Sequence, residues 1–334
     1  MKGHLFSAGP PRHALAAAAV VGLSLAAATP AAAAPATPAA AGVQPAHPGG
    51  GKGGGGGSGG GGTSTTGLDV SYPQCGTTLP STTAFAIVGV NGGLANDLNA
   101  CLGPSASYPD YSASELYWAS VAATGATGTS VAKVGLYVNT ADPGNIYDGR
   151  PIADWPTSGS AASYGTCATT TVSSRGKTYT VGADSDACAW VYGYNKATQD
   201  ATWLTTAAET INDQETTTSV ADTASAYPWW LDVETANTWQ SDTTMNVADL
   251  QGMIAGFQAA GAGSFGVYST AAQWTTITGG TTEADTGLYG LADWIPGASS
   301  LTSAEANCAL SSFTGGSVAI TQWTATLDND DACS

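Results

Sequence analysis

Residues 227–234 spell Tyr-Pro-Trp-Trp-Leu-Asp-Val-Glu, a short apolar run that ends in two carboxylates two positions apart. Alternate side chains of a β-strand point to the same face of the sheet. Asp232 and Glu234 are therefore expected to point the same way from the end of one strand. The tryptophans beside them, Trp229 and Trp230, make an ordinary solvated surface a poorer explanation of the pair than a site.

Similar apolar runs recur along the chain and alternate with helical patterns. Strands are predicted at 67–71, 85–91, 132–139, 228–234, 264–269, 288–294 and 317–323, and helices at 112–123, 188–213 and 246–260. Strands that alternate with helices favour a parallel sheet, and seven or eight units in this length favour a closed barrel. The predicted fold class is α/β, a single TIM-like, modified β/α barrel. Residues 141–187, rich in Pro, Thr and Ser, are expected to form an inserted loop region.

The residues before the barrel divide into two parts by composition. Residues 1–34 have a basic start, an Ala-rich apolar run and a small-residue end, which predicts a signal peptide. A membrane anchor is the alternative, but the apolar run is shorter than the ~20 residues that a spanning helix needs. Residues 35–66 are Ala/Pro-rich and then Gly-rich, which is typical of a flexible linker. We therefore expect residues 67–334 to be a secreted domain, extracellular or associated with the cell wall.

Charge restricts the partners of this domain. All 25 acidic residues lie after residue 66, together with only five basic residues, which gives a net charge of −20. Nucleic acids and anionic membranes are unsuitable partners, because binding their phosphates requires a basic surface. An uncharged polymer such as a carbohydrate fits better. No membrane contact is expected after signal cleavage, and a monomer is expected.

Six cysteines follow the predicted signal peptide: Cys75, Cys101, Cys167, Cys188, Cys308 and Cys333. An even number in an exported protein indicates disulfides, and six cysteines allow fifteen connectivities. The local pairs 75–101, 167–188 and 308–333 are expected, since each closes a modest loop. A cysteine metal site is the alternative, but no Cys-x-x-Cys spacing occurs. No metal and no cofactor are expected.

The positions of the histidines exclude some classes of catalytic site. All three histidines lie before residue 67, so catalysis by a Ser/His/Asp or Cys/His arrangement is excluded for the domain. Paired carboxylates remain, because close like charges separate their pKa values and leave one protonated while the other is ionised. Cleavage of a glycosidic bond requires such an acid and such an anion. Asp232 and Glu234 are therefore candidate catalytic residues.

The predicted barrel gathers further candidates at its mouth, because active sites of such barrels lie at the C-terminal ends of the strands. Asp69 ends the first predicted strand and is the third candidate catalytic residue. The candidate substrate-binding residues are Asn91, Tyr268, Trp230, Gln322, Asp328 and Asp330. Asp328 and Asp330 follow the last predicted strand, where a solvated acidic terminus is an equally good interpretation. A Ca²⁺ loop lacks the required spacing.

Several motifs, in this order, resemble glycoside hydrolase family 25, the lysozyme family with a modified β/α barrel. The opening strand Gly-Leu-Asp-Val-Ser at 67–71 resembles the family's G-x-D-V-S, and Leu-Asp-Val-Glu at 231–234 resembles its L-D-x-E. Tyr268-Ser269 with Trp274, and Gln322-Trp323-Thr324 with a trailing Asp, are similar to later motifs. The sequence departs from the family at Asn91-Gly92-Gly93, where an acidic-Gly pair is usual.

The resemblance implies cleavage of the β-1,4 bond between N-acetylmuramic acid and N-acetylglucosamine in peptidoglycan. It further implies that Glu234 is the general acid and that Asp232 orients or stabilises the substrate. Asp69 and either Asp328 or Asp330 would line the same acidic mouth. Two alternatives stay open: a catalytically silent barrel that binds the cell wall or another carbohydrate, and a hydrolase of another polysaccharide.

Overall fold

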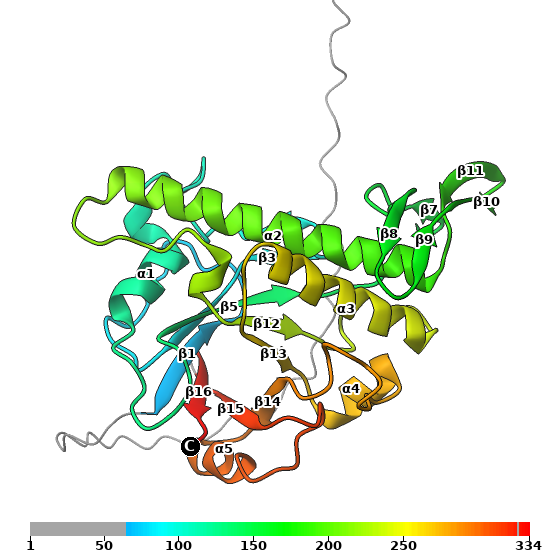
Figure 1. The fold of residues 1–334 in the computed structure, drawn as a ribbon. Helices are drawn as coiled ribbons and strands as arrows, with labels where there is room; N and C mark the ends of the chain where they lie inside the picture. The colour runs from blue at the N-terminus through cyan, green and yellow to red at the C-terminus, as the bar shows by residue number, and fades with distance from the viewer. Residues whose placement is uncertain (1–64, 326) are drawn as a thin grey trace, which may run out of the picture. The chain divides into compact units, whose positions relative to one another are not determined.

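Eight strands of the protein form a closed barrel in a mixed α/β fold (Figure 1). The computed structural model describes residues 65–325 and 327–334, so the expected signal peptide and nearly all of the expected linker lie outside the described residues. The barrel strands are β1 (Thr66–Val70), β2 (Ala86–Gly89), β5 (Val134–Asn139), β12 (Trp229–Asp232), β13 (Phe265–Tyr268), β14 (Ala292–Ala298), β15 (Val318–Thr324) and β16 (Asp328–Ala332). Each of the seven predicted strands overlaps one of the first seven of these.

Strand pairing explains how the barrel closes. From β1 through β2, β5, β12, β13 and β14 to β15, every neighbouring pair is parallel. β16 is antiparallel to both β15 and β1 and lies between them. The expectation of a closed barrel in an α/β protein is confirmed. The interpretation of 328–331 as an acidic tail is wrong: these residues are strand β16.

Helices connect most of the successive barrel strands. They are α1 (Glu115–Ala122), α2 (Asp186–Gln214), α3 (Thr243–Ala259), α4 (Ala271–Thr278) and α5 (Leu301–Asn307). α1, α2 and α3 correspond to the three predicted helices. Residues 71–85, between β1 and β2, contain no helix. Among the described residues, no helix is both long enough and apolar enough to span a bilayer.

The alternation along β12 determines what the barrel contains. Trp229 faces the helices and stacks on Phe257 of α3, with ring centroids 4.2 Å apart. Trp230 faces the interior, where it packs edge-on against Trp294 of β14 at 5.8 Å. Asp232, two residues further on, shares that inner face. The period of two therefore carries the carboxylate to the mouth of a barrel that is filled below by aromatic rings.

The segment 141–187 forms small hairpins instead of barrel strands. They pair β6 (Ile146–Tyr147) with β7 (Arg150–Pro151), β8 (Gly159–Ala161) with β9 (Gly165–Cys167), and β10 (Thr169–Ser174) with β11 (Lys177–Gly182). Figure 1 shows β8 to β11 gathered at one end of α2. A further hairpin, β3 (Asn91–Gly92) with β4 (Asp97–Leu98), follows β2.

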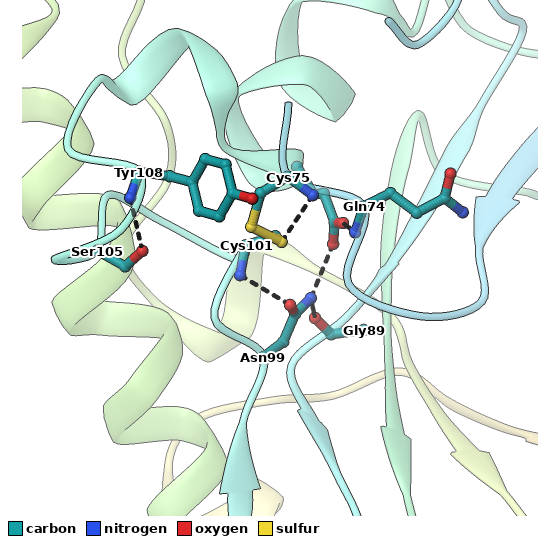
Figure 2. Close-up of a disulfide and its surroundings, with 8 residues drawn as sticks. Gln74, Cys75, Gly89, Asn99, Cys101, Ser105 and Tyr108 are labelled. Carbon is teal, nitrogen blue, oxygen red and sulfur yellow. Dashed lines mark hydrogen bonds between the residues drawn. A yellow bond between two sulfur atoms is a disulfide. The ribbon is translucent and has the colours of Figure 1, made fainter. Parts of the chain in front are cut away.

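The six cysteines form three disulfides, Cys75–Cys101, Cys167–Cys188 and Cys308–Cys333, which are the local pairs expected from the loop lengths. Figure 2 shows the surroundings of the first. Asn99 donates from its Nδ2 to the Gly89 carbonyl and to the buried Glu115 carboxylate, both at 2.7 Å. Its Oδ1 accepts the Cys101 N–H at 2.9 Å. This disulfide and Asn99 thus fasten the loops after β1 and β2 to α1.

α2 and α3 pack so closely that their backbones are nearly in contact. A Cβ atom at Gly252 of α3 would lie 2.0 Å from the carbonyl oxygen of Trp190 in α2. A Cβ atom at Gly193 of α2 would lie equally close to the carbonyl oxygen of Asp249 in α3. Glycine at these positions is thus a requirement of the packing, although it lowers the intrinsic helix propensity.

We predict that Gly252→Ala lowers the free energy of unfolding by about 1–3 kcal/mol, because the added methyl group forces the two helices apart. Urea denaturation followed by circular dichroism measures this change. Gly263→Ala is the matched control, since a Cβ atom there meets nothing within 4 Å. An equal effect of both substitutions would contradict the close packing of α2 on α3.

Candidate active site

A small acidic pocket lies at the C-terminal ends of the barrel strands. Its volume is about 90 Å³, and it is lined by Asp69, Ser71, Tyr137, Asp232, Glu234, Tyr268, Trp294, Gln322 and Asp328. These residues come from strands far apart in the sequence, and the strand register brings them together. Asp232 pairs with Tyr268 across β12 and β13, and Asp69 pairs with Asp328 across β1 and β16.

The turn after β12 is held by hydrogen bonds to its backbone. The Asp232 carbonyl accepts hydrogen bonds from the Thr140 hydroxyl at 2.5 Å and from Asn237 Nδ2 at 3.1 Å. The Trp239 indole N–H donates to the Glu234 carbonyl at 2.8 Å. These bonds engage only the backbone of Asp232 and Glu234, and both side chains line the pocket. Asp232 Oδ1 is buried and has no hydrogen-bond partner among the described residues.

Asp69 is held from the opposite side of the mouth by a relay of hydrogen bonds. Gln322 Nε2 donates to Asp69 Oδ2 at 2.8 Å, and the Tyr268 hydroxyl donates to Gln322 Oε1 at 2.9 Å. Because a hydroxyl donor faces Oε1, the amide of Gln322 is oriented with its NH₂ group toward Asp69. Tyr268 and Gln322 were expected to bind substrate. In the structure they position the carboxylate of Asp69, a candidate catalytic residue.

Asp330 lies beneath the pocket and does not line it. Its side chain is fully buried, and its Oδ1 accepts the Trp294 indole N–H at 2.8 Å. Burial raises the pKa of the Asp330 carboxyl group well above the usual value, and the charge of the nearby Asp69 raises it further. Asp330 Oδ2 is buried and has no hydrogen-bond partner among the described residues.

Burial raises the pKa of every carboxyl group that faces the mouth from deep in the barrel. The pKa of Asp69 is raised to about 7 by burial and then by the charge of Asp328. The pKa of Asp232 is raised well above the usual value by burial and by the nearby Glu234 and Asp69. Burial raises the pKa of Glu234 as well. The mouth therefore holds carboxylic acid protons at pH values where exposed carboxyl groups are ionised.

Asn91 and Trp230, also expected to bind substrate at the mouth, lie elsewhere. Asn91 Nδ2 donates to the buried Asp200 carboxylate at 3.0 Å, and its Oδ1 accepts the Asn139 N–H at 2.6 Å. All its hydrogen-bonding groups are thus used within the protein. Trp230 lies inside the barrel and lines a different pocket, at the other end.

Ser71, Tyr137 and Trp294 are the pocket residues that the sequence analysis did not name as candidates. Tyr137 lies two residues before Asn139 on β5, and its hydroxyl donates to the Val70 carbonyl at 3.1 Å. Trp294 packs edge-on against Tyr268 with centroids 4.7 Å apart. The alternation of β5 could have indicated Tyr137. In the part of the chain that the structure describes, no group of three or more His, Cys, Asp or Glu side chains is arranged to hold a metal ion.

We predict that Gln322→Met raises the pKa of Asp69 above its value of about 7, because the substitution removes a hydrogen bond that favours the ionised carboxylate. Carboxyl ¹³C NMR across a pH titration measures the shift. Tyr268→Phe is the control: it removes the donor to Gln322 Oε1 but keeps the amide beside Asp69, so a smaller shift is expected. An unchanged Asp69 titration in Gln322→Met would show that the amide does not support the carboxylate.

We also predict that the domain becomes less stable as the pH rises from about 4 to about 8. Burial raises the pKa of Asp69 and of Asp142 from the usual value of 3.8 to about 7. Between these values the folded state binds more protons than the unfolded state, so its stability is greatest at low pH and falls through pH 7.

Thermal unfolding at pH 5 and pH 8 tests this direction. The midpoint should be lower at pH 8, and Asp142→Asn should weaken the dependence, since an amide keeps the acceptor for Gln240 at 2.8 Å without titrating. A midpoint that rises between pH 5 and pH 8 would contradict the raised pKa values.

Comparisons with known proteins connect this site to lysozymes. A family model described as lysozyme-like protein 1 matches residues 198–291, which include Asp232, Glu234 and Tyr268. A Dictyostelium discoideum protein named "Probable GH family 25 lysozyme 4" is 47% identical over 53 residues, or 16% of this chain. The match spans 24% of that protein's length. No solved structure matches the chain.

The family match lies on β12, α3, β13 and α4, the elements that carry one side of the pocket. The Leu-Asp-Val-Glu motif at 231–234 and the family model therefore fall on the same part of the molecule. Over this part, the chain is similar to lysozyme-like proteins of family 25.

Proposed function

We propose that the protein is a secreted glycan hydrolase that cleaves β-1,4 glycosidic bonds of peptidoglycan by carboxylate acid catalysis. One observation carries the proposal: Asp69, Asp232 and Glu234 line a single pocket at the barrel mouth, within a chain related to lysozymes. The departing sugar oxygen needs a proton, and the developing positive charge on the sugar ring needs a nearby anion. A cluster of buried carboxyl groups with raised pKa values can provide both.

In this proposal Glu234 is the general acid. It lies beyond the end of β12 and is more exposed than Asp232, so its proton can reach a glycosidic oxygen in the pocket. Burial raises the pKa of its carboxyl group, which keeps the acid protonated closer to neutral pH. The carboxyl groups interact, so they titrate as a set.

Asp232 and Asp69 have different roles in this proposal. Asp232 is the more deeply buried carboxyl group, with a pKa well above the usual value and a free Oδ1, so in its protonated form it orients the substrate by hydrogen bonding. Asp69 accepts a hydrogen bond from Gln322, which favours its ionised form. Asp69 is therefore the anion that stabilises positive charge on the sugar. Asp328, at the rim, adds to the negative potential of the mouth.

The remaining parts of the proposal concern the whole chain. Residues 1–34 are the signal peptide, 35–66 the linker, and 67–334 a modified β/α barrel of TIM-like type with the insertion 141–187. Three disulfides support an oxidising environment outside the cell. The net charge of −20 supports a glycan partner over nucleic acid. We propose a monomer.

The size of the pocket favours a second candidate function. At about 90 Å³ it is smaller than the ~300–1,000 Å³ of pockets that enclose a ligand. A barrel that holds a glycan chain across its surface without cleaving it would need no larger pocket. A hydrolase of a different polysaccharide would use the same carboxylates. Cleavage assays separate these possibilities.

We predict that Glu234→Gln lowers the release of reducing ends from purified peptidoglycan by about 10²–10⁴-fold, because the amide cannot supply the proton. Glu209→Gln is the matched control, since Glu209 is exposed on α2 and away from the pocket. It should retain full activity.

Thermal unfolding of both variants should match the unsubstituted chain, which separates lost chemistry from lost folding. Equal activity of Glu234→Gln and the unsubstituted chain would contradict the assigned acid. Folded chains that all bind peptidoglycan without releasing reducing ends would support the non-catalytic barrel instead.

A further inference from the structure

A second pocket lies at the N-terminal ends of the parallel strands, opposite the carboxylates. Its volume is about 330 Å³, within the range of pockets that hold small ligands. Tyr227 and Pro228 precede β12, Ser264 precedes β13, and Ala292 begins β14, and all four line this pocket. Asp232 and Tyr268, at the other ends of β12 and β13, line the acidic pocket.

The chemistry of this second pocket differs from that of the mouth. None of its lining residues is charged, although the surrounding domain has a net charge of −20. Its walls are aromatic and aliphatic, with Trp230, Tyr227, Phe265 and Pro228 among them. Exposed serines, Ser225 and Ser264, add hydroxyl groups at the rim. An uncharged ligand with both a flat apolar face and hydroxyl groups matches this lining.

Trp230 supplies a directed hydrogen-bond donor. Six tryptophans of the described chain are buried, and five of them donate the indole N–H to a protein oxygen: Trp118, Trp155, Trp229, Trp274 and Trp294. The sixth is Trp230, which is 6% exposed and whose N–H meets no acceptor among the described residues. A buried indole normally finds a partner. The N–H of Trp230 is thus available to an acceptor in the pocket.

Two glycines hold the indole in this position. A Cβ atom at Gly266 would lie 2.1 Å from the six-membered ring of Trp230, so glycine there makes room for the indole. A Cβ atom at Gly135 would lie 3.4 Å from Trp230 Nε1, and Gly135 itself lines the pocket. The missing side chain at Gly135 leaves open the space beside the indole N–H.

We propose that this pocket is a second, non-catalytic glycan site that takes one uncharged pyranose residue, with an oxygen of the sugar accepting the Trp230 indole N–H. The ring packs against the aromatic walls, and the serine hydroxyls contact the sugar hydroxyls. The proposal rests on the proposed function insofar as both sites hold glycan. Two sites on opposite ends of one barrel would raise the avidity for a polymeric glycan that can reach both.

The test follows the indole resonances of the ¹⁵N-labelled chain during titration with N-acetylglucosamine and with its trimer. The Trp230 resonance is identified by its loss in Trp230→Phe. In the unsubstituted chain it should shift progressively toward saturation. In Gly135→Ala the methyl group blocks the space beside the N–H, so the apparent affinity at Trp230 should fall by about tenfold or more.

Gly135→Ala is expected to fold, because Gly135 does not adopt a positive φ and the added methyl group makes contacts of 3.4 Å or longer. Unchanged indole resonances elsewhere in its spectrum check this. The proposal is overturned if the Trp230 resonance does not move, if it moves equally in Gly135→Ala, or if the sugars shift only the Trp294 resonance at the mouth.

The proposed hydrolase activity and the proposed second glycan site can be tested independently. Release of reducing ends from peptidoglycan, measured on the same preparation, reports on the mouth alone, and Gly135→Ala should retain it on a soluble oligosaccharide. A chain that cleaves peptidoglycan without any Trp230 shift refutes the second site and keeps the hydrolase. A chain with the Trp230 shift and no cleavage keeps the second site and refutes the hydrolase.

Discussion

The acidic site depends on the pairing of β16 between β15 and β1, which closes the barrel. This antiparallel strand sets Asp328 opposite Asp69 and Asp330 opposite Gln322, so one short segment completes the mouth. The Cys308–Cys333 disulfide fastens the residue just after β16 to the end of α5. A strand made of Asp-Asn-Asp-Asp-Ala has little intrinsic preference for extended structure. Its two ladders and the disulfide supply the order that its composition does not.

Closure of the barrel raises the pKa values of the carboxyl groups at its mouth. The barrel interior holds large rings such as Trp230 and Trp294, and the carboxyl groups above them are removed from water. Burial then raises their pKa values, and the carboxyl groups raise one another's further. The domain has no histidine, so buried carboxyl groups such as Asp69, whose pKa is about 7, titrate near neutral pH in its place. The same burial that would keep the proposed acid protonated makes the folded state costly to ionise.

Local sequence patterns predicted the barrel strands and the carboxylate pair, but they did not predict features that depend on contacts in the folded chain. Apolar runs predicted seven barrel strands, and the spacing of Asp232 and Glu234 predicted a shared face at a strand end. β16 escaped prediction because its acidic composition has little strand propensity, and its order comes from pairing with β15 and with the distant β1. Trp230 was expected to bind substrate because it flanks the two carboxylates in the sequence, but two residues along a strand separate it from Asp232 by about 6.6 Å in depth. Asn91 was expected to bind substrate, although its amide is used by Asp200 and Asn139.

The most direct test of the account is a crystal structure of the Glu234→Gln chain with a bound tetrasaccharide fragment of peptidoglycan. The account predicts that the central glycosidic oxygen lies within hydrogen-bond distance of the residue 234 side chain, with Asp69 beside the sugar ring whose bond is cleaved. A tetrasaccharide bound only away from the acidic pocket, or one whose glycosidic oxygens all lie beyond reach of residue 234, would contradict it.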